Sequence, residues 1–281
     1  MRSTLPEVIH ATIDAAGVSA KSLLLNLFRT SPSNHWPVKK LIEVGDLFGF
    51  NANSIRVTLT RLKSSGLVEL DVRGSYRLNW QYDPVRDWID NWSKGEARVV
   101  EWDQQWLCIL PPSDLTAKGA RSLEYAATRL GFKKLADRAW LRPNNLSMPT
   151  SKIIELLEAM SACSNLAISI VSEVHIVGEV HSISSLWNGS KLEEKYRALT
   201  LRLNRSMKDL EDADEKQALR DSFLIGGDAI RRLALDPLLP EGMIDVEVRE
   251  EFTRCTMSFI SKFNGLWRDR FGPEMMDALP S

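Results

Sequence analysis

The stretch from Ala52 to Leu78 reads ANSIRVTLTRLKSSGLVELDVRGSYRL. Its first half has the apolar spacing of an amphipathic helix and ends at Gly66. Its second half alternates apolar and polar residues on either side of an Arg73-Gly74-Ser75 tip, as a short hairpin does. A helix followed directly by a two-stranded hairpin is the reading half of a winged helix-turn-helix. This stretch therefore predicts the fold of the N-terminal region.

The predicted helix has two chemically different faces. At about 100° per residue, Ile55, Leu59 and Leu62 share one narrow sector and face the core. The opposite side carries Asn53, Arg56, Val57, Thr60, Arg61 and Ser64. No acidic residue occurs between Ala52 and Ser65, and an acid-free face fits contact with phosphates and base edges. For this helix taken alone, a basic surface without a ligand is the alternative.

The surrounding sequence strengthens the DNA-binding interpretation. Ser19 is a predicted N-cap of a first helix, a second helix begins at Val38, and Asn51 or Asn53 caps the third. Positions 17 to 78 hold nine basic and four acidic residues, an excess of five (9 − 4), although the whole chain has a net charge of −1. The residues predicted to bind double-stranded DNA are Asn53, Ser54, Arg56, Val57, Thr60, Arg61, Lys63 and Arg73.

Length and composition indicate a multidomain intracellular protein. The 281 residues exceed what one core usually holds. The cysteines Cys108, Cys163 and Cys255 are odd in number and lack metal-ligand spacing, which favours a reducing, cytoplasmic setting. No segment approaches the ~18 apolar residues of a membrane span. We expect no membrane association, no metal, no cofactor and no catalytic residue.

The remaining sequence predicts an α+β architecture with an N-terminal winged helix-turn-helix, a middle ferredoxin-like α/β sandwich and a C-terminal helical domain. In the middle region, predicted strands at 102–110, 139–143 and 166–177 alternate with two helices, which favours the sandwich. The expected segments are a winged helix-turn-helix at 17–80, a connector helix at 83–95, the sandwich at 98–182 and the helical domain at 184–275.

The segment SIRVTLTRLKSSGLVELDVRGSYRL resembles the N-terminal signature of PaaX-type repressors, the regulators of phenylacetate catabolism. The matching residues are Arg56, Arg61, Leu62, Gly66, Tyr76 and Leu78. The resemblance continues in the Trp-Asp-x-x-Trp motif at Trp102, in Trp-x-Arg-Pro at Trp140 and in Asp236-Pro-Leu-Leu-Pro240. It covers about residues 20 to 271 and departs from the family pattern at Gly242-Met-Ile-Asp.

This resemblance implies a DNA-binding transcriptional repressor that binds a palindromic operator as a homodimer. It also implies release from DNA by an aromatic acyl-CoA effector, with phenylacetyl-CoA as the type case. From the residues, Arg138, Trp140 and Arg142 alternate along a predicted strand. Two guanidiniums beside an indole can hold a phosphate and stack a purine, so these residues form a predicted effector site. An exposed sheet face or a dimer contact is the alternative.

Two other functions remain open at this point. The first is a metal-dependent nuclease that uses the middle domain, for which Asp103 is the one suitable acid near the first strand. A ferredoxin-like fold by itself does not imply that activity, and we expect the chain not to be an enzyme. The second is an interaction module whose winged helix does not touch DNA, against which the acid-free helix argues.

Overall fold

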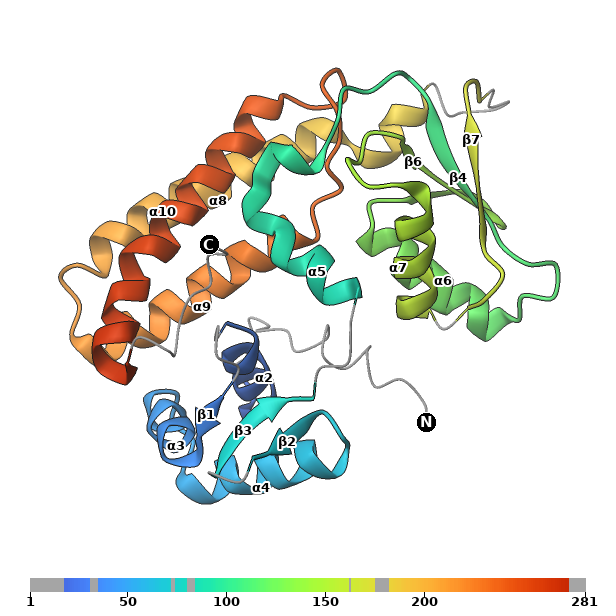
Figure 1. The fold of residues 1–281 in the computed structure, drawn as a ribbon. Coiled ribbons are helices and arrows are strands. Elements are labelled where there is room, and N and C mark those ends of the chain that lie inside the picture. Colours follow the sequence, from blue (N-terminus) through green and yellow to red (C-terminus); the bar gives the residue numbers. More distant parts are fainter. Residues whose placement is uncertain are drawn as a thin grey trace. The chain divides into compact units, whose positions relative to one another are not determined.

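The computed structural model describes residues 18–30, 35–71, 74–79, 84–161, 163–174 and 182–272. It confirms the α+β class, since the chain combines helices with two small antiparallel sheets (Figure 1). The chain forms two compact units. The first combines the described residues up to position 79 with 202–230 and those from 255 onward, and the second combines 84–201 with 231–254. The predicted domain boundaries remain predictions.

Within its described residues, the N-terminal part of the first unit forms three helices and a three-stranded sheet. These elements are α2 (Ala20–Thr30), β1 (Trp36–Pro37), α3 (Val38–Leu47), α4 (Ala52–Ser64), β2 (Val68–Leu70) and β3 (Ser75–Leu78). The sheet order is β1-β3-β2 with antiparallel neighbours. Helix α2 begins as predicted, because the Ser19 Oγ accepts a hydrogen bond from the backbone N–H of Ser22 at 3.0 Å.

Three C-terminal helices contribute to both units: α8 (Gly189–Asp209), α9 (Glu215–Ala234) and α10 (Val246–Phe271). The core of the first unit includes Leu219 and Phe223 from α9, and Trp267 and Phe271 from α10. The Phe223 ring lies 5.4 Å from that of Trp267 and 5.7 Å from that of Phe48, measured between ring centroids. The N-terminal helices and the ends of two C-terminal helices therefore share one core.

The second unit is built around a four-stranded antiparallel sheet. Its elements before α8 are α5 (Pro84–Asp90), η1 (Asn91–Arg98), β4 (Trp106–Leu110), α6 (Ala117–Arg129), β5 (Lys133–Ala136), β6 (Ala139–Pro143), α7 (Thr150–Ser161), β7 (Ala167–Val171) and η2 (Ile183–Trp187). The strand order is β5-β6-β4-β7, and α6 and α7 lie along one side of the sheet (Figure 1). On β4, Leu107 and Ile109 are fully buried.

The sequence prediction for this sheet was wrong in three respects. The strand predicted at 166–177 is shorter, since β7 ends at Val171. Strand β5 was not predicted, because its lysines and its alternately exposed side chains are typical of a polar edge strand rather than of a core strand. The first strand begins at Trp106 instead of Trp102. Gln104 has a positive φ of 68°, and the Trp102 indole N–H donates to the carbonyl of Gln105 at 2.6 Å. The chain therefore turns before β4 begins.

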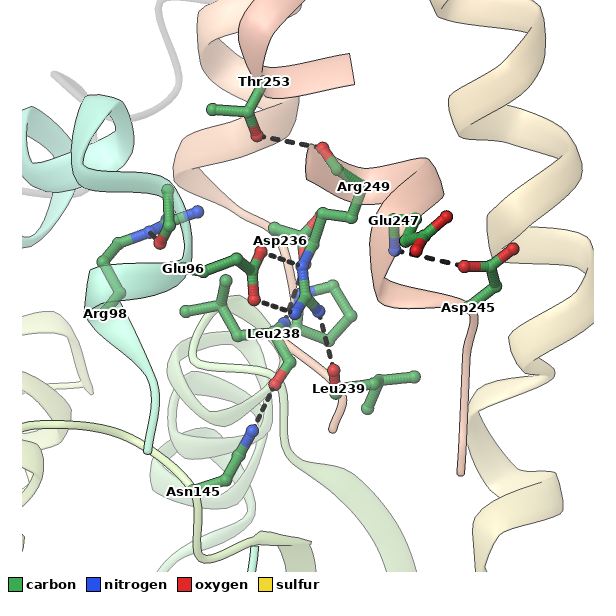
Figure 2. Close-up of polar contacts among 12 residues, drawn as sticks. Glu96, Arg98, Asn145, Asp236, Leu238, Leu239, Asp245, Glu247, Arg249 and Thr253 are labelled. Carbon is green, nitrogen blue, oxygen red and sulfur yellow. Dashed lines mark hydrogen bonds and ion pairs between the residues drawn. The ribbon is translucent and has the colours of Figure 1, made fainter. Parts of the chain in front are cut away.

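A network of buried polar groups in the second unit holds the turn after α9 (Figure 2). Leu238 is fully buried and has a φ of 53°, a conformation that costs a bulky L residue about 1–3 kcal/mol. The Asp236 carboxylate accepts from the Leu238 N–H at 2.8 Å and from the Tyr196 hydroxyl at 2.6 Å. The Asn145 amide donates to the Leu238 carbonyl at 2.7 Å. These bonds offset the backbone strain.

Two further side chains complete this network, which we call the buried arginine network. Arg249 donates to both Glu96 carboxylate oxygens at 2.8 and 2.5 Å, and to the Leu239 carbonyl at 2.7 Å. The second arginine, Arg142, donates to the Asn145 side chain at 3.2 Å and contacts the Pro237 carbonyl at 3.5 Å. Burial and the Asp236 carboxylate raise the pKa of Tyr196 well above its usual value, so the Tyr196 hydroxyl remains a donor at neutral pH.

Candidate nucleic-acid interface

Helix α4 is fixed in position by its cap and by its inner face. The Asn51 side chain accepts a hydrogen bond from the backbone N–H of Ser54 at 2.8 Å, so Asn51 is the cap of the two predicted candidates. Ile55, Leu59 and Leu62 are buried, as the wheel predicted. Helix α3 packs so closely that a Cβ on Gly45 would lie 2.6 Å from the Ile55 Cγ1 atom. The opposite face of α4 is therefore held rigidly toward solvent.

The outward face of α4 carries most of the residues predicted to bind DNA. Exposed on it are Asn53, Arg56, Val57, Thr60, Arg61 and Lys63, whereas Ser54 is half-buried beside the cap. Ser64, which the wheel places on the same face, is also exposed although it was not in the predicted set. The helical period already placed Ser64 on this face, and that position was the signal for including it. We call this surface the α4 face.

The cations of the α4 face have no counter-ion in the described part of the chain. Within the described part of the chain, the guanidiniums of Arg56 and Arg61 and the ammonium of Lys63 form no hydrogen bond or ion pair. The Thr60 hydroxyl donates to the carbonyl of Arg56 at 3.0 Å, so its hydrogen is used within the helix. The face therefore offers charged donors for an external acceptor, and arginine pairs well with a carboxylate, a phosphate or the edge of a guanine.

The hairpin beside α4 is ordered by local bonds. The Asp71 side chain accepts from the Ser75 N–H at 2.8 Å and lies 3.2 Å from the imidazole Nδ1 of His35. Arg77 on β3 forms an ion pair with Glu69 on β2. Its charge is therefore balanced within the fold, unlike the charges of the α4 face, which have no partner among the described residues. Arg73, the predicted tip residue, lies outside the described residues.

The three residues predicted to bind an effector do not share one surface. Arg138 is exposed in the turn between β5 and β6, and donates to the Pro112 carbonyl. Trp140 is 1% exposed, and Arg142 is completely buried. The Arg142 guanidinium donates to the Leu130 carbonyl in addition to the contacts given above. Burial lowers the pKa of Arg142 to about 9, which leaves the group charged at neutral pH.

This geometry corrects the expectation that Trp140 and Arg142 lie on an accessible face of the sheet. Register places Trp140 opposite Ile109 and Arg142 opposite Leu107, so both side chains share the fully buried side of the sheet. Sequence spacing predicted that they lie on one face but not that this face is covered. An effector would reach Arg142 only if the peptide groups around it moved. The geometry gives this arginine a structural role, and effector binding by these residues remains a prediction.

The acid considered for metal chemistry makes a local contact. The Asp103 carboxylate accepts a hydrogen bond from the backbone N–H of Gln105 at 3.0 Å. Within the described ranges, no group of three or more His, Cys, Asp or Glu side chains is placed to hold a metal ion. In the same ranges, every helix is too short or too polar to span a membrane.

The comparisons with known proteins point to one family and one fold. Residues 19–81 match the model of the family described as PaaX-like protein. The match confirms the PaaX-type resemblance over the segment that contains α4 and the hairpin. No curated protein matches the chain.

A solved structure also resembles the chain beyond that segment. It is the uncharacterized protein Rv0674 from Mycobacterium tuberculosis, with a TM-score of 0.52 and 18% sequence identity. The similarity covers 89% of this chain and 99% of that one. At this identity the likeness shows a shared fold alone.

Proposed function

We propose that the chain is a DNA-binding transcriptional regulator, a repressor of the PaaX type. The PaaX-like match over residues 19–81 suggests a regulator of the phenylacetate pathway. The observation that carries the proposal is the α4 face, where exposed donors stand on a rigid helix that contains no acidic residue. Such a face matches the negative charge of a duplex and the acceptors of its major groove.

The arrangement of elements supports a winged helix-turn-helix for the N-terminal region. Helices α2, α3 and α4 precede the β2–β3 hairpin, and β1 joins that hairpin by pairing with β3. In this proposal α4 enters the major groove while the hairpin lies beside the backbone. In the second unit, the order β4-α6-β5-β6-α7-β7 with the sheet order β5-β6-β4-β7 supports a ferredoxin-like sandwich.

DNA binding can be tested with duplexes that span the region upstream of the chain's own gene, because repressors of this type commonly control neighbouring genes. The proposal expects specific retardation in a gel-shift assay, with resistance to an excess of unrelated duplex. It also expects affinity to fall steeply with salt, since each neutralised phosphate releases counter-ions. Binding that any unrelated duplex abolishes equally would remove the specific-regulator proposal.

The proposed assembly is a cytoplasmic homodimer on a palindromic operator, released by an aromatic acyl-CoA such as phenylacetyl-CoA. For release to follow from effector binding, the effector must bind the DNA-free form more tightly than the DNA-bound form. Calorimetry with phenylacetyl-CoA and with free phenylacetate tests this: the proposal expects binding of the thioester alone. Equal or absent binding of both compounds would overturn it. An Arg142→Ala variant that stays folded but loses thioester affinity would support effector binding at Arg142. Unchanged affinity would exclude Arg142 from the effector site.

We also propose that the chain is not a nuclease. Incubation of the protein with single-stranded and double-stranded DNA and RNA in Mg²⁺ or Mn²⁺ tests this point. We expect no cleavage. Cleavage that Asp103→Ala abolishes would establish the nuclease function in place of this proposal.

A further inference from the structure

The α4 face has one apolar side chain at its centre. At about 100° per residue, Val57 lies about 200° around the helix from the buried Ile55. Asn53 lies one turn before it and Arg61 one turn after it. Val57 is 41% exposed, and the other outward side chains of α4 are polar or charged.

Folding alone gives no reason for a valine here. A β-branched residue is a weaker helix former than lysine, glutamine or alanine, and its exposed methyl groups gain nothing from water. A single exposed apolar residue is ordinary on a protein surface, as Val100 shows in the second unit at 52% exposed. What distinguishes Val57 is its position beside Arg56 and Arg61, whose guanidiniums have no acceptor among the described residues, on the face that is proposed to contact DNA.

The chemistry of the major groove supplies a matching group. Base edges there present hydrogen-bond donors and acceptors, and the one apolar group is the C5-methyl of thymine. Asn53 and Arg61 suit the polar edges, whereas Val57 suits only the methyl. We propose that Val57 reads a pyrimidine C5-methyl group, so that each half-site contains a thymine at the position beneath this side chain. This inference rests on the proposed DNA binding and specifies what the site reads.

The same chemistry defines a second ligand. 5-Methylcytosine carries its methyl group at the same ring position as thymine, so a valine that reads this methyl contributes the same contact to either base. The exocyclic group at C4 still differs, and neighbouring donors such as Arg61 sense that difference. Deoxyuridine, in contrast, differs from thymidine only by lacking the methyl, and it therefore isolates the Val57 contact.

The experiment uses a duplex enriched by the full-length protein from a random pool. Each thymine is then replaced in turn by deoxyuridine, and affinity is measured by fluorescence anisotropy. One position per half-site should weaken binding about fourfold, which corresponds to about 0.8 kcal/mol for one buried methyl group at 1.4 kcal/mol per tenfold. Other thymines should show no change.

The valine is tested in the same titrations through a double-mutant cycle. Both protomers of the proposed homodimer carry the substitution, so Val57→Ala should weaken binding to the thymine duplex by about fourfold for each half-site, about sixteenfold in all. It should no longer distinguish thymine from deoxyuridine at the sensitive position. Val100→Ala is the matched control and should retain the discrimination. Alanine is a better helix former than valine, so the Val57 variant is expected to fold.

The outcomes separate the inference from the proposed function. Specific binding with no deoxyuridine effect at any position would overturn the methyl readout and leave DNA binding intact. So would a Val57→Ala variant that still prefers thymine at the sensitive position. Failure to enrich any duplex would instead overturn the proposed function, and the inference with it.

Discussion

Arginine serves opposite purposes in two parts of this chain. On the α4 face, Arg56 and Arg61 are exposed and engage no acceptor within the described residues. In the buried arginine network, Arg142 and Arg249 are 0% and 1% exposed and donate to peptide carbonyls and side-chain oxygens. The side-chain chemistry is identical, so the difference lies in whether the fold itself supplies the acceptors. An arginine without internal acceptors is available to an external one.

The largest effect is expected from breaking the ion pair between the buried Arg249 and the half-buried Glu96. Arg249→Met should lower the free energy of unfolding by about 2–3 kcal/mol, because it leaves the Leu239 carbonyl and the partly exposed Glu96 carboxylate without their donor. Chemical denaturation measures the change. Arg205→Ala, at an exposed position of α8, is the control and should change stability by no more than about 0.5 kcal/mol. A similar stability for the Arg249 and Arg205 variants would contradict the structural role.

The exposed arginines should show the reverse pattern. Arg56→Ala should weaken specific DNA binding by about 1–3 kcal/mol if it contacts a base, and should change the free energy of unfolding by no more than about 0.5 kcal/mol. Anisotropy titration and denaturation of the same preparation give both values. A loss of stability that matches the loss of affinity would show that Arg56 supports the fold instead of reading DNA.

The Tyr196–Asp236 bond predicts how stability depends on pH. The pKa of Tyr196 is raised in the folded protein, so its folded value exceeds the unfolded value of about 10. The bond therefore stabilises the fold fully below about pH 10 and less as the pH rises above it. Denaturation at a series of pH values should show this alkaline loss in the wild type and a smaller one in Tyr196→Phe. Parallel curves would indicate that the tyrosine ionises equally in both states.

The smallest effect concerns a cation expected to contact phosphate. Lys63 is exposed near the end of α4. Lys63→Ala should weaken binding to specific and unrelated duplexes alike, and should reduce the slope of log affinity against log salt by about one. A selective loss for the specific duplex would place Lys63 at a base edge instead.

Local sequence rules predicted the α4 face well. The positions of Ile55, Leu59 and Leu62 follow from the helical period, and the Asn51 cap follows from side-chain chemistry within three residues. Both depend only on neighbours in the chain. The absence of acidic residues between Ala52 and Ser65 likewise predicts that the cations of this helix have no ion-pair partner within it.

The buried arginine network could not be predicted in the same way. The acceptors of Arg142 include the Pro237 carbonyl, 95 positions away in the sequence, and Arg249 reaches Glu96 across 153 positions. Alternation along β6 indicates which residues share a face, but coverage of that face depends on distant segments. The same reason explains why the sequence did not predict that Trp267 and Phe271 pack into one core with the N-terminal helices.

The most direct test of the account is the affinity of an Arg56→Ala/Arg61→Ala double variant for a duplex that the wild type binds specifically. Circular dichroism and denaturation would establish that the variant is folded, and Arg205→Ala would control for the loss of one surface charge. The account predicts that specific binding falls to the level seen with unrelated duplex, whereas the control retains it. Full specific binding by the folded double variant would contradict the assignment of the α4 face as the DNA-reading surface.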